Sequence, residues 1–554
     1  MTERTRNVLT LVLLLALVLP AYLRGVAILY DLDRPPDVDL LRDVGAAQNI
    51  LDGGYGKDPI YLGETAWYPP LLSVILAGLS SMTGSPVMVV AARAGIHLDL
   101  LPLAAFAFLL WRSFGRIAAL FGVAGYLYLV HDHAPAWLAP SLSPYLFAIC
   151  FMHGAFCIGL YLAFRLRRPS AGWSQWCAAG ALVAITFVGH PSTAMILCLL
   201  LGGVGASQLL KVLRDGPARL QQVGNLTSFL IIAAIGAWVL LAPMIEAYGM
   251  ERRNPFSTTW QMEGLLLKDL PGTLLDRPLL VSVLIALGFF VTLRRRDSIS
   301  AILLYATAII TGLLLWSSVS AELANTHQRS VILSFVPAYH FVFYLELMGC
   351  LFFAIGSMVL VKWAIGSVRR WIPSTFYDRV RHPLARPVFR RAAIMVGILA
   401  LMVLLPFTSS FLHRKIDSMV NKAASRPADP YAPSFDFIHA GTAPTDVFLT
   451  QDRVAMDLIS PAGRKLVATD RYFSNPYVDL APRAADRDSM LTFIREDRVK
   501  DFLTLAAVYS VDFVIPNVRP SARWNGILSP VHEDPRIRIY RLERGDRNVG
   551  TGRN

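Results

Sequence analysis

The stretch from Asp31 to Leu72, DLDRPPDVDLLRDVGAAQNILDGGYGKDPIYLGETAWYPPLL, decides how this chain is interpreted. It follows directly on an apolar segment and ends in a Tyr-Pro-Pro turn that leads back into apolar sequence. Carboxylates beside a bilayer are costly unless they are solvated or paired, so an acidic loop at this place needs a reason. We therefore interpret it as a loop at the membrane surface that carries chemistry.

The composition of the whole chain is that of a membrane protein. Of its 554 residues 55% are hydrophobic and 16% are charged, and the mean hydropathy is +0.48. Apolar runs of about 20 residues recur along the first three quarters, which predicts a polytopic α-helical membrane protein. The net charge of +13 comes largely from Lys and Arg in short loops between these runs. This is the positive-inside pattern, so we expect no nucleic-acid partner.

We predict about eleven transmembrane helices within residues 1–411, with the N-terminus cytoplasmic. The first outer loop then covers residues 30–70. The segment from Leu71 to Met82 is too short to cross, so we expect a re-entrant or interfacial helix there. The predicted spans are Val8–Leu29, Pro86–Trp111, Ile117–Val130, Pro144–Phe164, a hairpin of two that turns at His190, Leu226–Tyr248, Pro278–Leu293, Ile299–Ser317, Val331–Val361 and Ala392–Phe411.

Residues 412–554 have a different composition and predict a second, extracytoplasmic α/β domain. An amphipathic helix is expected over residues 490–509. We find no glycine-rich phosphate loop and no Ser/His/Asp or Cys/His pattern in this part of the sequence, so the pattern indicates an architecture but not a function. Short strands are expected at Asp446, Lys465, Phe513 and Ile537.

Three carboxylates of the loop, Asp37, Asp39 and Asp43, are candidates for a general base. A carboxylate can take the proton of an acceptor hydroxyl, and a second one could help to hold a divalent cation such as Mg²⁺ or Mn²⁺. Apolar residues at helical spacing between Asp39 and Leu51 predict a helix lying on the membrane, which places Asp39 and Asp43 on one face, one turn apart. A solvated acidic loop without chemistry is the alternative.

The order of features in this stretch resembles the first outer loop of GT-C-type glycosyltransferases. The acidic segment is followed by an Ala-rich helix over residues 45–51 and a Gly-Gly-Tyr turn at 53–55. Then come Asp58-Pro59 and a Tyr-Pro-Pro-Leu sequence at 68–71 that opens the short apolar helix. The class includes aminoarabinose transferases, protein mannosyltransferases and actinobacterial arabinosyltransferases.

The resemblance implies an outward-facing active site that uses a polyprenyl-phosphate sugar donor, and many bacterial members carry an outer C-terminal domain. It implies that an Asp of this loop is the catalytic base, and position favours Asp39, then Asp37, then Asp43. We therefore expect a membrane glycosyltransferase of the bacterial inner membrane, active in cell-envelope polysaccharide biosynthesis. The acceptor, whether lipid, glycan or protein, stays open.

Sugar transfer from a polyprenyl phosphate needs positive charge for the departing phosphate. Arg329, beside His327 at the outer mouth of the tenth span, is our first candidate, because a guanidinium binds phosphate oxygens bidentately. An interfacial arginine that reaches to lipid headgroups explains the same residue equally well. Arg252 and Arg253, in the loop after the seventh span, are lesser candidates for this role.

His190, Tyr68 and Glu322 are candidates for lining the site or positioning the acceptor. His190 precedes a proline in a tight turn, where a polar cap is the more common role. A His-Asp-His triplet at 131–133 has spacing compatible with metal binding but supplies too few ligands for a closed site.

Two other functions stay open at this point. One is a transporter or flippase for a lipid-linked glycan or polysaccharide, although the spans do not form two similar halves and we see no inverted repeat. The other is a non-catalytic envelope-assembly protein that keeps the GT-C fold. Replacement of Asp39 and Asp37 would separate an enzyme from a scaffold, because only the enzyme needs them.

Overall fold

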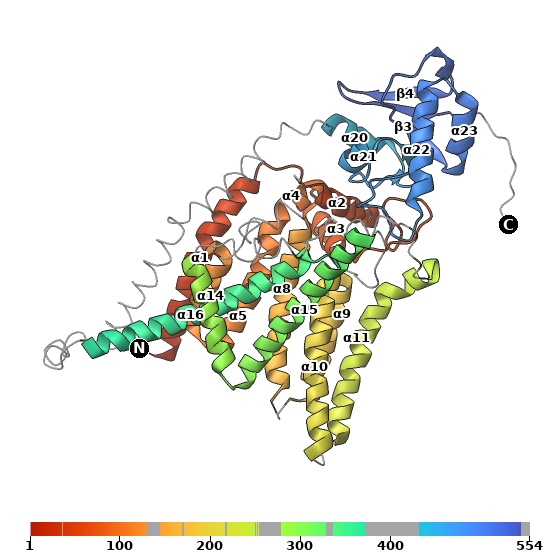
Figure 1. Cartoon of the computed structure of the whole chain (residues 1–554). Coiled ribbons are helices and arrows are strands. Elements are labelled where there is room, and N and C mark those ends of the chain that lie inside the picture. Colours follow the sequence, from red (N-terminus) through yellow and green to blue (C-terminus); the bar gives the residue numbers. More distant parts are fainter. Residues whose placement is uncertain are drawn as a thin grey trace. The chain divides into compact units, whose positions relative to one another are not determined.

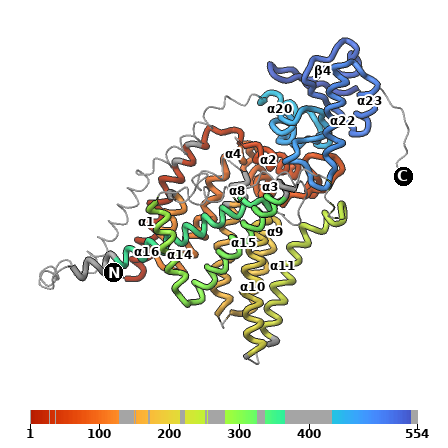
Figure 2. Tube along the Cα trace, viewed as in Figure 1, coloured from red at the N-terminus to blue at the C-terminus, as the bar shows by residue number. Residues whose placement is uncertain are grey.

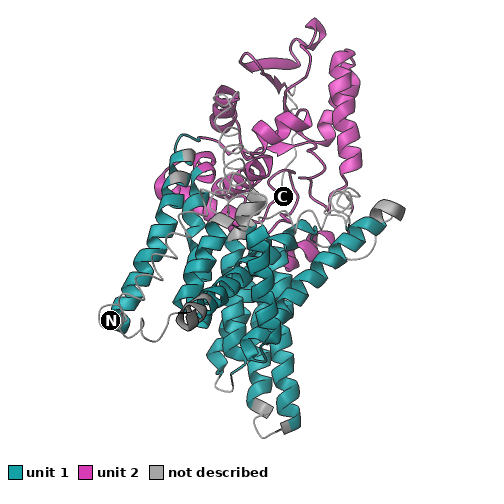
Figure 3. Cartoon of the chain, turned by 60° about the vertical axis from the view of Figure 1, so that its left-hand side comes forward, with its two compact units in different colours: residues 1–32, 93–238, 261–423 teal, residues 33–92, 239–260, 424–554 magenta. Residues whose placement is uncertain are grey.

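The computed structural model describes residues 2–35, 37–129, 144–168, 171–215, 219–249, 279–327, 336–371 and 431–543, together with Glu251, Arg253 and Leu267. The chain forms two compact units, which Figure 3 draws in different colours. Unit 1 comprises residues 1–32, 93–238 and 261–423, and unit 2 comprises residues 33–92, 239–260 and 424–554. The expected boundary between residues 411 and 412 lies outside the described residues. Residues 33–92, which include most of the first loop, belong to the same unit as the C-terminal strands.

Unit 1 is built from apolar helices (Figure 1). In the described part of the chain, six helices are long and apolar enough to cross a membrane, and five shorter apolar helices accompany them. The prediction of a multi-pass helical membrane protein is thus confirmed, while the span Ala392–Phe411 lies outside the described residues. The helices are α1 Glu3–Leu29, α4 Val87–Leu98 (which begins in unit 2), α5 Leu100–Phe114, α6 Arg116–Ala124 with the π-helical turn η1 Gly125–Leu129, α8 Pro144–Leu166, α9 Trp173–Gly189, α10 Pro191–Asp215, α11 Arg219–Tyr248 (which ends in unit 2), α14 Leu279–Arg294, α15 Ser298–His327 and α16 Tyr339–Trp371.

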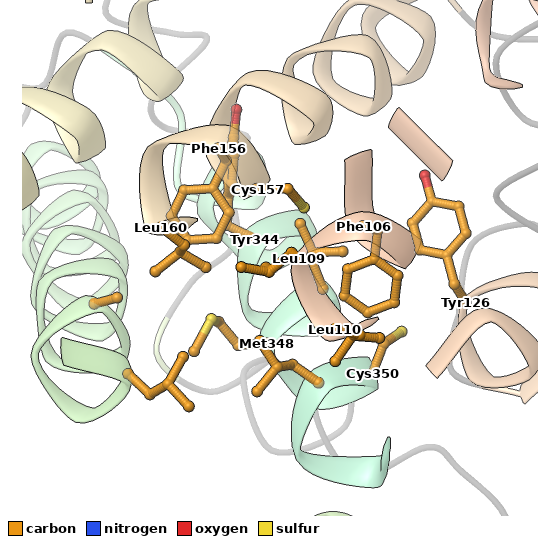
Figure 4. Close-up of a cluster of buried hydrophobic side chains, with 14 of the residues drawn as sticks. Phe106, Leu109, Leu110, Tyr126, Phe156, Cys157, Leu160, Tyr344, Met348 and Cys350 are labelled. Carbon is orange, nitrogen blue, oxygen red and sulfur yellow. The ribbon is translucent and has the colours of Figure 1, made fainter. Parts of the chain in front are cut away.

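Helix α16 is the most buried of the long apolar helices, with 78% of its most apolar window inside the structure. It meets α14 at two glycines: a Cβ on Gly288 would lie 1.9 Å from the carbonyl oxygen of Phe352, and one on Gly356 would lie 2.0 Å from that of Leu284. Small residues allow such close backbone contact, which is how many membrane helices associate. Figure 4 shows another part of the core, where side chains of α5, α8 and α16 pack together.

The ninth predicted span is longer than expected. Helix α15 continues ten residues beyond the predicted end at Ser317, to His327. Glu322 and His327 therefore lie in this helix, although the predicted span ended before them. The segment after Ser317 is SVSAELANTH, which contains good helix formers and neither Gly nor Pro, so nothing in it ends the helix.

Unit 2 combines a helix of the first loop and the short apolar helix that follows the loop with a C-terminal α/β fold, whose path Figure 2 traces in blue. The five-stranded sheet has the order β2-β1-β3-β5-β4. Strands β2, β1 and β3 are parallel, whereas β5 runs antiparallel to β3 and β4. The elements are α2 Val38–Leu51, α3 Leu71–Thr83, α20 Ala432–Gly441, β1 Val447–Leu449, α21 Asp452–Val454, the π-helical turn η3 Ala455–Ile459, β2 Lys465–Leu466, α22 Leu480–Arg495, α23 Val499–Val508, β3 Val511–Val514, the 3₁₀ turn η4 Ala522–Trp524, β4 Leu528–Glu533 and β5 Arg538–Leu542.

The expected α/β domain is confirmed, with two differences in detail. The helix predicted over residues 490–509 is two helices, α22 and α23, separated at Asp497, which has a φ of 57°. Strand β4 was not predicted, because it contains Pro530. Proline is tolerated in edge strands, and β4 is the last strand of the sheet order.

Two residues of the first loop are part of the core of the C-terminal fold. Ile60 and Tyr61 are buried to 3% and 0% exposure and pack in one cluster with Phe448 and Phe513 of the sheet. The backbone N–H of Leu466 in β2 donates to the carbonyl of Ile60 at 2.8 Å. The first loop is therefore held by a strand about 400 residues further along the chain.

Candidate active site on helix α2

The first turn of α2 places the three candidate carboxylates. Asp37 is the N-cap, and its Oδ1 accepts a hydrogen bond from the backbone N–H of Asp39 at 2.9 Å. An N-cap carboxylate satisfies an N–H group that the helix leaves unpaired. Asp37 therefore has a structural task, which makes it a weaker candidate for the base than Asp39.

Arg42 joins the two other carboxylates in different ways. Its Nε and Nη2 donate to Oδ1 of Asp43 at 2.9 and 2.8 Å, and Asp43 is only 2% exposed. The Nη1 of Arg42 lies 4.0 Å from Oδ1 of Asp39, which is beyond hydrogen-bond distance, and the side chain of Asp39 keeps 21% exposure. Asp43 is thus bound by the guanidinium, while Asp39 is near it but accessible.

The electrostatics of the cluster suit a base at Asp39. Burial raises the pKa of Asp39, and the positive charge of Arg42 only partly offsets this effect. For Arg42, burial acts to lower the pKa, but Asp43, Tyr68 and Asp39 outweigh it and raise the pKa, so the guanidinium stays charged. A carboxylate with a raised pKa is a stronger base when it is ionised.

Tyr68 completes the cluster. The guanidinium carbon of Arg42 lies 4.2 Å from the centre of the Tyr68 ring, a cation–π contact. Burial raises the pKa of the Tyr68 hydroxyl, so this group stays protonated at neutral pH. The structure therefore places Asp39, Asp43 and Tyr68 around Arg42, a residue that was not among the candidates, with Asp37 one turn away at the start of the helix. The spacing of Arg42, three residues after Asp39 on a helix, was the signal that could have found it.

Asp58 is a second residue that the sequence analysis quoted without giving it a role. It is 1% exposed and accepts hydrogen bonds from the backbone N–H groups of Ile60 and Tyr61 at 2.7 and 2.9 Å, and from the side-chain amide of Asn475 at 2.8 Å. These bonds are those of a carboxylate that shapes a turn and attaches it to the C-terminal fold.

Most candidates for the donor phosphate lie beyond what the structure describes. Arg252, Arg329 and the side chain of His327 are outside the described residues. Arg253 is exposed, and its backbone N–H donates to the carbonyl of Pro476 at 3.0 Å. The phosphate-binding role of these four residues stays a prediction.

The two remaining candidates, His190 and Glu322, belong to unit 1, whereas Arg42 and the carboxylates around it belong to unit 2. His190 is 3% exposed, its Nδ1 lies 2.7 Å from Oγ of Ser192 at the start of α10, and its ring centre lies 4.9 Å from that of His340. This is the polar-cap arrangement that the sequence analysis gave as the alternative. Glu322 is half-buried in α15.

The described residues contain no group of three or more His, Cys, Asp or Glu side chains that could hold a metal ion. The His-Asp-His triplet at 131–133 is outside them. A divalent cation stays a prediction.

No protein-family model matches the sequence, and no curated protein sequence matches it. Solved structures do match. ArnT from Cupriavidus metallidurans in the apo state is similar over 98% of this chain and 98% of its own, with a TM-score of 0.54 and 14% identity. The same protein bound to undecaprenyl phosphate gives a TM-score of 0.53 and 14% identity, over 96% of this chain and 97% of its own. Archaeoglobus fulgidus AglB, in complex with an inhibitory peptide and a dolichol-phosphate, gives a TM-score of 0.48 and 11% identity, over 91% of this chain and 69% of its own.

The similarity to ArnT extends over nearly the whole of both chains, so it covers the helical part and the C-terminal α/β part alike. At 14% identity it establishes the fold. The chain has the fold of the GT-C membrane glycosyltransferases, and the resemblance inferred from residues 31–72 is confirmed at that level.

Proposed function

We propose that this protein is a membrane glycosyltransferase that moves one sugar from a polyprenyl-phosphate donor to an acceptor on the extracytoplasmic face, with Asp39 as the general base. The observation that carries the proposal is the division of roles on α2. Arg42 is bound to Asp43, so Asp39 is left accessible, with its pKa raised by burial.

The reaction needs one proton acceptor and one stabilised leaving group. The acceptor hydroxyl gives its proton to a carboxylate oxygen of Asp39 while its own oxygen forms a bond to the anomeric carbon of the sugar. The bond between that carbon and the phosphate oxygen breaks, and the polyprenyl phosphate leaves with the electron pair. We propose that Arg329, His327, Arg252 and Arg253 supply the positive charge that the departing phosphate requires.

The donor class is supported by the fold and by what the similar protein binds. ArnT, which has this fold, is bound to undecaprenyl phosphate in one of its structures. A lipid carrier also suits a multi-pass protein, because the activated sugar then arrives at the membrane surface. The acceptor is a hydroxyl compound of lipid, glycan or protein type.

The test is replacement of Asp39 by Asn in the full chain, purified in lipid nanodiscs and supplied with polyprenyl-phosphate sugars and an envelope extract as acceptor source. We expect kcat for sugar transfer to fall by about 10²- to 10⁴-fold, the range for loss of a general base. Binding of the polyprenyl-phosphate sugar, measured by a thermal shift, should stay within about threefold, because Asp39 is not a phosphate ligand in this proposal.

Asp31→Asn is the matched control, since Asp31 is an exposed carboxylate of the same loop. It should keep wild-type kcat. Wild-type transfer by Asp39→Asn would overturn the assignment of the base. Donor binding without transfer by the wild-type protein, with every class of acceptor, would favour the non-catalytic assembly protein.

A further inference from the structure

Helix α2 is held at its C-terminal half by one segment of the C-terminal fold, residues 460–465. Three residues of α2 and its C-cap residue, which have the spacing of a single helix face, make these contacts, namely Gly45, Gln48, Asn49 and the C-cap Asp52. The cluster of Asp39, Arg42 and Asp43 occupies another face, about a third of a turn away. The segment 460–465 therefore holds the helix without covering the candidate base.

The contact begins with two close approaches. A Cβ on Gly45 would lie 2.1 Å from the carbonyl oxygen of Ser460, so only glycine fits at this point of the helix. A Cβ on Gly463, which has a φ of +73°, would lie 2.9 Å from Cγ of Gln48. The two backbones thus meet at Gly45 and Ser460, and the backbone of Gly463 packs against the side chain of Gln48.

Two buried cations complete the contact. Lys465 of β2 is 5% exposed, and its Nζ donates to Oδ1 of Asn49 at 2.9 Å and to the carbonyl of Asp58 at 2.7 Å. The Nη1 of Arg464 donates to Oδ2 of Asp52 at 3.1 Å. The amide of Asn49 donates to the carbonyls of Gly54 and Lys57, so this residue also ties the helix to its following turn.

Arg464 is itself fixed from several directions. Besides Asp52, it donates to the carbonyls of Ala462, His439 and Thr442, and to the hydroxyl of Thr442. Lys465 is anchored by its backbone, since β2 is paired with β1. Both cations thus project from a rigid frame, which is what a positioning residue requires.

The distance along α2 from Asn49 to Asp39 is long enough for a small tilt of the helix to displace Asp39. Asp39 lies ten residues before Asn49, which is about 15 Å along an α-helix. A tilt of about 4° at Asn49 moves Asp39 by about 1 Å, and a misplacement of that size can cost about 10²-fold in rate.

We propose that Lys465 and Arg464 are positioning residues for the candidate base, and that the C-terminal fold sets the orientation of α2 through them. This inference rests on the proposed function of Asp39. The contact is specific to the tertiary structure, because the residues that meet are more than 400 positions apart in the sequence.

The experiment uses the full chain in nanodiscs and compares Lys465→Met with Lys465→Arg and with Lys500→Met, a matched control on the exposed surface of α23. Lys465→Met should lower kcat by about 10- to 100-fold while the KM for the donor changes less than about threefold. Lys465→Arg, which keeps a donor at this place, should recover part of the loss. Lys500→Met should behave as the wild type.

Hydrogen exchange of the same proteins gives a readout that does not depend on activity. We expect faster exchange of the amides of α2 in Lys465→Met, with exchange in β1 and β3 unchanged. Gly45→Ala adds a single methyl group at the same contact and should have the same effect, which covers the case that Lys465→Met does not fold.

Unchanged exchange of α2 in these variants would overturn the positioning role, whether or not the protein transfers sugar. A loss of kcat that merely follows the fraction of folded protein would overturn it as well. Absence of transfer by the wild type would count against the proposed function alone, since the exchange comparison still decides whether Lys465 holds α2.

Discussion

At the scale of single residues, the candidate site depends on how one arginine is shared between two carboxylates. Arg42 makes two hydrogen bonds to Asp43 and none to Asp39. A buried ion pair of this kind is costly to break, because one charge would stay behind without a partner. The arrangement therefore leaves Asp39 as the accessible carboxylate beside Arg42, while Asp37 caps the helix.

The pH dependence of transfer follows from the environment of Asp39. The base must be ionised, so kcat/KM should fall as the pH falls through its pKa, and burial places that pKa above the ordinary value of about 3.9. The raised pKa of Asp39 affects stability in the opposite direction to activity: activity rises with pH, whereas the contribution to stability falls. Between the unfolded and folded pKa values the folded state binds the extra proton, so the contribution of Asp39 to stability decreases as the pH rises through this window.

A pH–rate profile of the wild-type protein in nanodiscs measures the first effect. We expect an acidic limb at higher pH than an ordinary aspartate would give, and we expect it to be absent from the residual activity of Asp39→Asn. An acidic limb that persists unchanged in Asp39→Asn would assign it to another group.

At the scale of the elements, close packing between helices depends on glycines at a few defined points. In unit 1, Gly356 of α16 and Gly288 of α14 let the two backbones meet. In unit 2, Gly45 does the same for α2 and the segment 460–465. Sequence patterns predicted these helices but not the glycines at which they touch, since a glycine in an apolar run looks the same whether it faces a helix or lipid.

Gly356→Ala tests the packing of α14 against α16. The new methyl group would lie 2.0 Å from the carbonyl oxygen of Leu284, so the helices must separate. We expect a loss of about 1–3 kcal/mol of stability, as for other overpacked cores. Thermal unfolding in detergent measures it as a lower Tm.

Gly312→Ala in α15 is the matched control, because a Cβ there would meet nothing within 4 Å. It should leave the Tm unchanged or raise it slightly, since alanine is the better helix former. Equal changes in Tm for the two variants would contradict a role of Gly356 in close packing.

At the scale of the whole molecule, the first loop and the C-terminal fold form one compact unit. Tyr61 illustrates this, since its ring is fully buried in the core of the sheet and its hydroxyl lies 2.9 Å from Oγ of Ser474. A residue near the start of the chain is therefore part of the hydrophobic core of a domain encoded near its end.

Tyr61→Ala should accordingly destabilise the C-terminal fold. Loss of a large buried aromatic side chain costs about 3–5 kcal/mol. Limited proteolysis of the full chain should then cleave within residues 431–543 faster than in the wild type, whereas Tyr55→Ala, a change of an exposed tyrosine in the same loop, should not. Equal protection of both variants would show that the C-terminal fold is stable without the first loop.

The sequence by itself determined the elements that depend on local pattern and composition. Apolar runs of sufficient length identified the membrane helices, and short apolar segments identified four of the five strands near their observed positions: β1, β2, β3 and β5. The Asp-rich stretch with its Tyr-Pro-Pro turn indicated the fold, because that loop is a contiguous piece of sequence. Asp39, Asp43 and Tyr68 could be proposed as candidates from the sequence because they lie in the same contiguous stretch.

Only the tertiary structure decided which distant residues meet. The contacts of Lys465 and Arg464 with Asn49 and Asp52 depend on the folding of residues 460–465 against residues 45–52. Such contacts leave no periodic signal, because buried polar groups are satisfied by whichever partner the fold brings near. The physical reason is that helices and strands follow from neighbouring residues, whereas a site is assembled by packing.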